Sequence, residues 1–69
     1  MAQTPRTYGA SLFEQGKALI QQGNYAAAAE MFTLSFNQGV KERNTKLVAV
    51  SLKMAGDVYR LLKKVAAYG

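Results

Sequence analysis

The chain has 69 residues with no cysteine and no histidine, and its formal net charge is +5. Disulfide bonds are therefore excluded, as is zinc held by its usual cysteine and histidine ligands. A chain of this length buries only about 60% of the surface that it exposes when unfolded. Small domains without such supports commonly depend on a partner, so we expect oligomerisation or docking onto a larger protein.

The N-terminal residues 1–7 are polar, contain the only proline and lack the apolar core of a signal peptide. No stretch of the chain approaches the roughly 20 apolar residues of a membrane span. We therefore expect a soluble, cytoplasmic protein. Residues 1–7 would form a flexible tail, and residues 8–69 would form a single three-helix domain.

The net positive charge comes entirely from the second part of the chain. Residues 1–40 contain two basic and two acidic residues, whereas residues 41–69 contain seven basic residues and two acidic ones. This asymmetry indicates either an anionic partner or a solvated helix face in a basic protein.

Apolar residues at helical spacing predict a first helix that ends near Gln22. It would begin at residues 4–5 or at Ser11, where a Ser-x-x-Glu spacing is typical of a capping box. Gly23 is expected to end this helix, and Asn24 is expected to cap the next one. Because the turn is short, the two helices should be antiparallel neighbours.

The second helix is expected over residues 25–38, with Gly39 as its stop. The residues from Gly39 to Asn44 would form a charged connection. The third helix would be capped by Asn44 or Thr45 and would reach about Ala66 or Ala67. No segment alternates with a period of two residues, so no strand is expected and the predicted fold class is all-α.

Apolar residues cover roughly half of the circumference of the third helix, at about 100° per residue. The two shorter helices can cover one stripe, formed by Val48, Leu52, Ala55, Tyr59 and Leu62. The other stripe would remain partly open as an oligomer or docking face, formed by Leu47, Met54, Val58, Leu61 and Val65. A second copy related by a twofold axis, giving a dimer, or a groove on a larger complex would cover it.

The spacing of small and aromatic residues resembles that of the tetratricopeptide (TPR) repeat. The first helix of that repeat shows W-x2-L-G-x2-Y and the second shows A-x3-F. The first pattern falls on Leu12, Gln15, Gly16 and Leu19, with Gln15 departing from it, and the second falls on Ala28 and Phe32. The resemblance implies an antiparallel helix pair in which Gly16 and Ala28 allow close contact.

A second, partial match lies on the third helix, at Leu52, Ala55, Gly56 and Tyr59. The interval between Gly16 and Gly56 is longer than the family repeat of about 34 residues. The resemblance thus covers one repeat and half of the next, and it implies a close-packing role for Gly56. The alternative is an unrelated three-helix bundle.

The resemblance also implies a concave groove that holds a peptide or a partner helix. By position it assigns partner-binding roles to Phe13, Lys17 and Ile20 on the first helix and to Lys53, Asp57 and Arg60 on the third. Lys64 extends the same basic stripe. Plain solvation of these cations is the alternative.

The sequence carries no recognisable catalytic, cofactor or metal site. Its only acidic residues are dispersed, at Glu14, Glu30, Glu42 and Asp57, and no phosphate-binding glycine motif is present. We therefore expect a non-catalytic protein–protein interaction module that needs no cofactor or metal: an adaptor, an assembly factor or an accessory subunit. Binding of nucleic acid or of another anionic surface through the basic third helix is the alternative.

Overall fold

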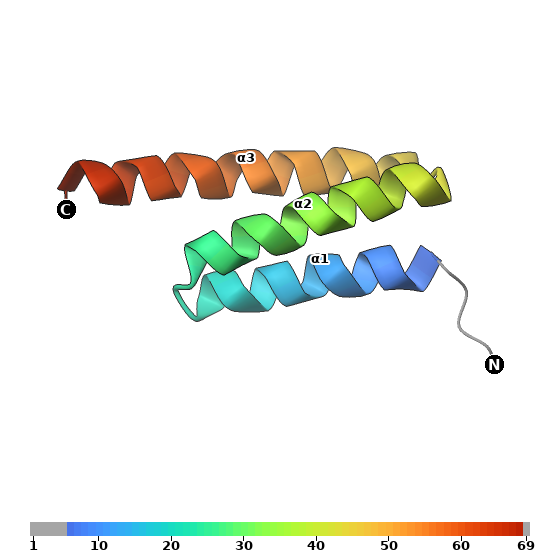
Figure 1. The fold of residues 1–69 in the computed structure, drawn as a ribbon, viewed down its shortest axis with the longest axis horizontal. Helices are drawn as coiled ribbons and strands as arrows, with labels where there is room; N and C mark the ends of the chain where they lie inside the picture. Colours follow the sequence, from blue (N-terminus) through green and yellow to red (C-terminus); the bar gives the residue numbers. More distant parts are fainter. Residues whose placement is uncertain (1–5, 69) are drawn as a thin grey trace.

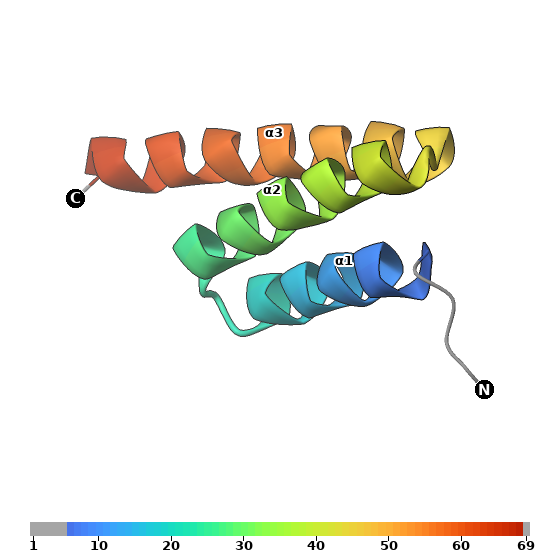
Figure 2. The same ribbon diagram turned by 45° about the vertical axis from the view of Figure 1, so that its right-hand side comes forward.

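The computed structural model describes residues 6–68, which fold into three α-helices and, among these residues, no strand. Helix α1 spans Arg6–Gln21, α2 spans Tyr25–Glu42 and α3 spans Thr45–Tyr68. Both Figure 1 and Figure 2 show α2 between α1 and α3, with consecutive helices antiparallel. The predicted all-α fold with three helices is confirmed. Residues 1–5 of the expected tail lie outside the described residues.

The turn between α1 and α2 follows its local chemistry. Gly23 has a φ of 79°, and its N–H donates to the carbonyl oxygen of Ile20 while the N–H of Asn24 donates to that of Leu19, both at 2.9 Å. This pattern closes the end of a helix around a left-handed glycine. The side chain of Asn24 then accepts a hydrogen bond from the N–H of Ala27 at 3.4 Å. The predicted stop and cap are confirmed.

Gly39 does not end α2, contrary to the expectation from the sequence. Helix α2 continues to Glu42 and ends at Arg43, a non-glycine residue with a φ of 57° whose N–H donates to the carbonyl oxygens of Gly39 and Val40. A Cβ on Gly39 would lie 3.1 Å from Cγ2 of Val48. This glycine therefore lets α3 approach α2 closely instead of ending the helix.

The other helix limits differ from expectation by a few residues. Helix α1 begins at Arg6, so Ser11 lies inside the helix and caps nothing. Asn44 caps α3, since its Oδ1 accepts a hydrogen bond from the N–H of Leu47 at 3.1 Å. Helix α3 continues to Tyr68, beyond its expected end.

The core lies along α2, and the ring of Phe32 is the largest fully buried side chain among the described residues. Its buried members come from α2 and α3: Ala28, Ala29, Phe32, Ala55 and Val58. A Cβ added to Gly16 of α1 would lie 2.7–2.9 Å from atoms of the Phe32 ring. Gly16 was expected to face Ala28; the structure instead places the ring of Phe32 against it.

Helix α3 is rotated relative to the expected orientation. Leu47 and Val58, expected on the open docking face, are buried, whereas Leu52 and Tyr59, expected in the covered stripe, are exposed. The buried row runs at helical spacing through Leu47, Ser51, Ala55 and Val58. Because this row includes a polar residue, apolar periodicity alone placed the centre of the buried face incorrectly.

Two buried serines link the three helices. Ser35 and Ser51 are both fully buried. The Oγ of Ser35 lies 2.9 Å from the carbonyl oxygen of Gly9 and 2.9 Å from the Oγ of Ser51. A carbonyl oxygen can only accept a hydrogen bond, so the hydroxyl of Ser35 donates to Gly9. The single hydroxyl proton of Ser35 is then engaged in this bond. Ser51 must then donate to Ser35, which completes a chain of hydrogen bonds from α3 through α2 to α1.

Replacing Gly16 and Gly56 separately with alanine tests the two glycine environments. Each variant gains about 1 kcal/mol of helix propensity. Only the methyl group at Gly16 must displace the ring of Phe32, at a cost of about 1–3 kcal/mol. We expect Gly56→Ala to have a higher free energy of unfolding than the wild type. The free energy of unfolding of Gly16→Ala, also measured in urea, should be about 1–3 kcal/mol lower than that of Gly56→Ala. Equal stabilities would contradict the packing of Phe32 against Gly16.

Alanine substitutions of the two serines test the direction of the hydrogen-bond chain. Ser35→Ala leaves the buried hydroxyl of Ser51 without its acceptor and should cost about 1–3 kcal/mol. Ser51→Ala keeps the bond from Ser35 to Gly9 and should cost only about 0.5–1.5 kcal/mol. The double variant should be no less stable than Ser35→Ala, since no hydroxyl is left unpaired. Additive losses, measured by urea unfolding, would show that the hydroxyls act independently.

Candidate docking surface

Helix α3 is longer than the two helices that pack beside it. It has 24 residues, compared with 16 in α1 and 18 in α2. At about 1.5 Å per residue, this length carries α3 past the ends of its neighbours. Figure 1 shows its C-terminal end extending beyond the α1–α2 turn. Leu62 still packs against the core, whereas Lys63 to Ala66 are exposed.

Two apolar side chains near this end are exposed, and we call Leu61 and Val65 the C-terminal apolar pair. Val65 lies about two turns after the fully buried Val58 and therefore on the same side of α3. It is nevertheless 55% exposed, because α1 and α2 do not reach that far. A shallow hollow of about 430 Å³ lies beside Leu61, and the other described residues that line it are Arg60, Lys63 and Lys64.

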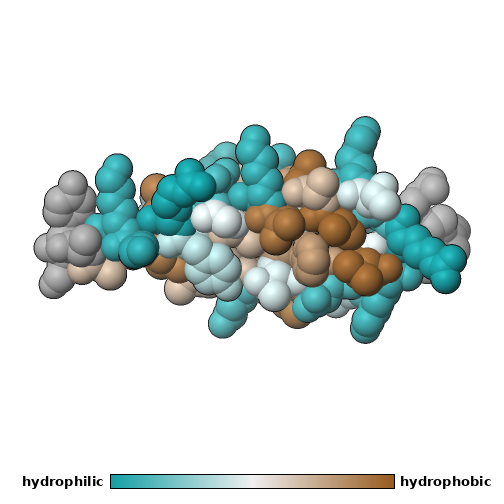
Figure 3. Space-filling model, turned by 90° about the horizontal axis from the view of Figure 1, so that it is seen from above, coloured by the Kyte–Doolittle hydropathy of each residue, from teal (hydrophilic) through white to brown (hydrophobic). Residues whose placement is uncertain are grey.

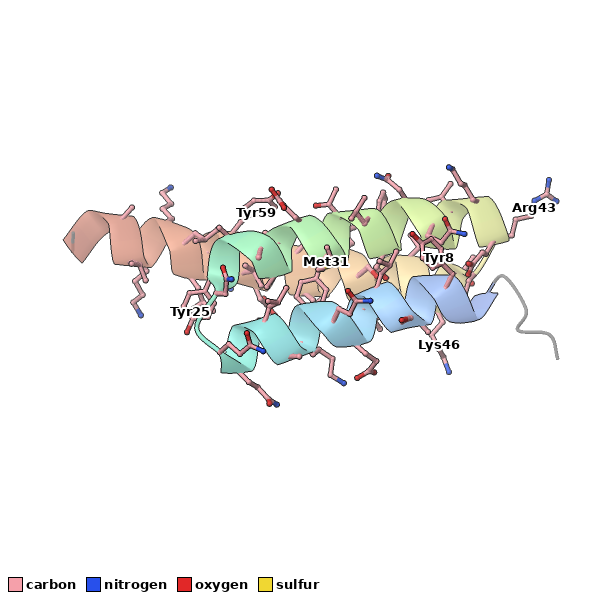
Figure 4. All side chains as sticks on the ribbon, turned by 60° about the horizontal axis from the view of Figure 1, so that its bottom comes forward. Tyr8, Tyr25, Met31, Arg43, Lys46 and Tyr59 are labelled. Carbon is pink, nitrogen blue, oxygen red and sulfur yellow. The ribbon has the colours of Figure 1, made fainter. Side chains whose placement is uncertain are left out.

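A second exposed apolar surface lies elsewhere on α3. It consists of Leu52, Gly56 and Tyr59, which follow one another at helical spacing, and we call it the tyrosine edge. Leu52 is 61% exposed and Tyr59 is 55% exposed. Figure 4 shows Tyr59 on the side of the bundle away from α1. A Cβ on Gly56 would meet no atom within 4 Å, so the expected close-packing role of this glycine within the chain is wrong.

A hollow of about 380 Å³ lies near the α2–α3 turn. The described residues that line it are Gly39, Val40, Arg43, Asn44, Thr45, Val48 and Ala49. Arg43 is the charged member of this lining and lies at the turn, as Figure 4 shows. Val48 is one helical turn before Leu52, so the hollow lies next to the tyrosine edge. Figure 3 shows apolar side chains gathered on the α3 side of the molecule, toward this end.

The cations of α3 lie between these two apolar surfaces. Lys53, Arg60 and Lys64, which we call the basic strip, are exposed, and none of them is in an ion pair with another residue that the structure describes. Asp57 is half-buried. Leu52 and Leu61 are nine residues apart, or about two and a half turns, so they lie on opposite sides of α3 with the strip between them.

The predicted partner-binding residues of α1 have mixed environments. Phe13 is half-buried with its ring centroid 5.4 Å from that of Phe32, and Ile20 also packs against the core. Lys17 is exposed, with its Nζ 5.6 Å above the ring centroid of Phe13 and 3.5 Å from Oε2 of Glu14. No ion pair or hydrogen bond between described side chains joins these residues to the basic strip. The structure thus places these α1 residues among packing and local contacts.

The acidic residues form no cluster that could chelate an ion. Within residues 6–68, no three acidic side chains come close enough to hold a metal ion. None of the helices in this part of the chain is apolar over a length that would cross a bilayer. The surface chemistry of the described chain is therefore that of exposed aliphatic and aromatic side chains next to cations.

Comparison with known proteins returned no match among protein-family models, curated proteins or solved structures. The resemblance to TPR repeats therefore stays a prediction from the sequence.

Sequence reasoning missed the hollow near the turn. Val40 and Arg43 were expected in a loop, and the only signal for a continuing helix was the apolar Val40 directly after Gly39. A helix that extends through Gly39 brings Val40 into the lining of the hollow together with Val48.

Proposed function

We propose that this chain is a small, non-catalytic protein–protein interaction module that docks onto itself or onto a larger complex, as an adaptor, assembly factor or accessory subunit. The observation that carries this proposal is the exposure of large apolar side chains on α3, where Leu52, Tyr59 and Val65 are each more than half exposed. Fully burying one such side chain contributes about 1.5–3 kcal/mol. Covering several of them would outweigh the gain from exposed ion pairs, at about 0–1 kcal/mol each.

A non-catalytic role agrees with the side chains available. The chain has neither histidine nor cysteine, which are the commonest general base and a common nucleophile. Glu14 and Glu30 are exposed on different helices, and Glu42 is half-buried with its Oε2 accepting a hydrogen bond from Gln38 at 3.0 Å. No described group combines a nucleophile with a positioned base. Binding is the activity that these side chains support.

A homodimer formed through the C-terminal apolar pair is one form that this docking can take. Light scattering coupled to size exclusion, at several micromolar concentrations, tests it. We expect a mass above that of the monomer for the wild type and a monomer for the double variant Leu61→Lys, Val65→Lys, because lysine removes the apolar contact. The exposed Leu34 on α2 provides the control, since Leu34→Lys should keep the wild-type mass. A wild type that stays monomeric at every concentration would contradict self-association.

Binding of nucleic acid or of another anionic surface is the second candidate. The cations of the basic strip favour it, because they are exposed and form no ion pair within the described part of the chain. Fluorescence anisotropy with labelled single-stranded and duplex oligonucleotides tests this candidate. If the strip contacts phosphates, affinity should fall steeply with salt, and Lys53→Glu with Arg60→Glu should abolish both the affinity and its salt dependence. Affinity that is unchanged in this double variant would assign the cations to solvation alone.

A further inference from the structure

We propose that the tyrosine edge binds an acidic amphipathic helix of another protein, with the partner backbone crossing α3 at Gly56. This inference rests on the proposed function and assigns it a second surface and a class of partner. It concerns a different side of α3 from the C-terminal apolar pair. The two surfaces can therefore be tested separately.

The shape of the edge fits a helix. Leu52, Gly56 and Tyr59 have the i, i+4, i+7 spacing with which one helix presents a row of side chains to another. Leu52 and Tyr59 project from the surface, and between them Gly56 has no side chain and no neighbour within 4 Å of an added Cβ. The edge thus consists of two projecting side chains, Leu52 and Tyr59, separated by a gap at Gly56 that we call the notch. A helix with a small residue at the crossing point could bring its backbone close to Gly56.

No contact with another described residue explains this glycine. Glycine inside an exposed helix is less favourable than alanine, and the other helical glycines each face a neighbour. A Cβ on Gly9 would lie 2.6 Å from Cδ2 of Leu47, and one on Gly39 would lie 3.1 Å from Cγ2 of Val48. The space that a Cβ on Gly16 would take is occupied by the ring of Phe32. Gly56 would equally permit a close approach, and the space beside it is open to a group from another protein.

The positive charges around the tyrosine edge indicate an acidic partner. Helix α3 carries five basic residues and one acidic residue, Asp57. Lys53 and Arg60 lie along one side of the tyrosine edge. Lys63 lies about one turn after Tyr59, at the C-terminal end of the edge. Arg43 lines the hollow at the opposite end of the edge. A helix with carboxylates beside its apolar stripe would complement these cations.

The apolar content of the edge favours a protein over a nucleic acid. Phosphates would use the basic strip, but they would gain nothing from Leu52 or from the notch at Gly56. The hollow next to the edge is lined by Val40, Val48 and Ala49, and it offers an apolar side chain of the partner a place to bury. Cations around an apolar row with a hollow at its end match a helix that is apolar on one face and acidic at its margins.

The test is a selection with the full chain against a displayed library of helical peptides about 20 residues long. The peptides share a leucine and alanine stripe, and their flanking positions vary among Asp, Glu, Gln, Lys and Arg. We expect the selected peptides to be acidic and to shift the backbone NMR signals of Leu52, Gly56 and Tyr59. Selected peptides that are neutral or basic, or the absence of any binder, would overturn the proposal.

The decisive variant is Gly56→Leu. Leucine fills the notch, so affinity for the selected peptide should fall by about tenfold or more, while the melting temperature rises because leucine favours the helix. Loss of binding therefore cannot result from unfolding. Leu34→Ala removes an exposed leucine on α2 and should leave affinity unchanged. Full affinity in Gly56→Leu would overturn the crossing at Gly56.

Two further outcomes separate this proposal from its alternatives. Peptide binding that shifts the signals of Leu61 and Val65, and not those of the tyrosine edge, would retain the docking function and overturn the assignment of this edge. Binding of a labelled oligonucleotide that displaces the selected peptide and depends on Lys53 and Arg60 would overturn the protein partner in favour of nucleic acid.

Discussion

The burial of Phe32 is the constraint on which the arrangement of the three helices depends. Its ring is fully buried in the middle of α2, lies against Gly16 of α1 and belongs to the same cluster as Ala55 and Val58 of α3. A Cβ on Gly16 would lie 2.7–2.9 Å from atoms of this ring, so α1 can approach α2 at this point only because Gly16 has no side chain. The ring of Phe13 also packs on Phe32, with its centroid 5.4 Å away. The fit of the Phe32 ring against these two residues therefore sets the separation of α1 and α2.

The sequence predicted helix ends where they depend on local chemistry. Gly23 and Asn24 act through their own backbone and side chain, so reading the residues in order was sufficient. Gly39, like Gly23, is a glycine that follows an apolar helical pattern, and the sequence alone indicates a helix end at both. The role of Gly39 instead depends on Val48, which lies in another helix. A left-handed arginine at the end of α2 has no comparable signal in the sequence, because most residues at such positions are glycine or asparagine.

The candidate surface was predictable only in part for a related reason. Leu61 and Val65 are exposed as expected, since that expectation followed from the greater length of the third helix. The burial of Leu47 and the exposure of Leu52 depend on how far α3 is rotated, and the observed rotation places Ser51 against Ser35 in the buried face. A hydroxyl that is buried because it has a hydrogen-bond partner looks, in a sequence, like a residue of the solvent face. Periodicity in apolar residues alone therefore assigned the wrong stripe to the core.

The part of α3 beyond Leu62 has a further consequence for local stability. Its side chains from Lys63 to Ala66 are exposed, so its backbone hydrogen bonds depend on intrinsic helix propensity, and short helices without tertiary packing are marginal in water. Amide hydrogens in these turns should exchange with solvent by local opening, much faster than those of α2 around Phe32. A protein that covers this segment would slow the exchange, and part of its binding free energy would be spent on holding the last turns in the helical state.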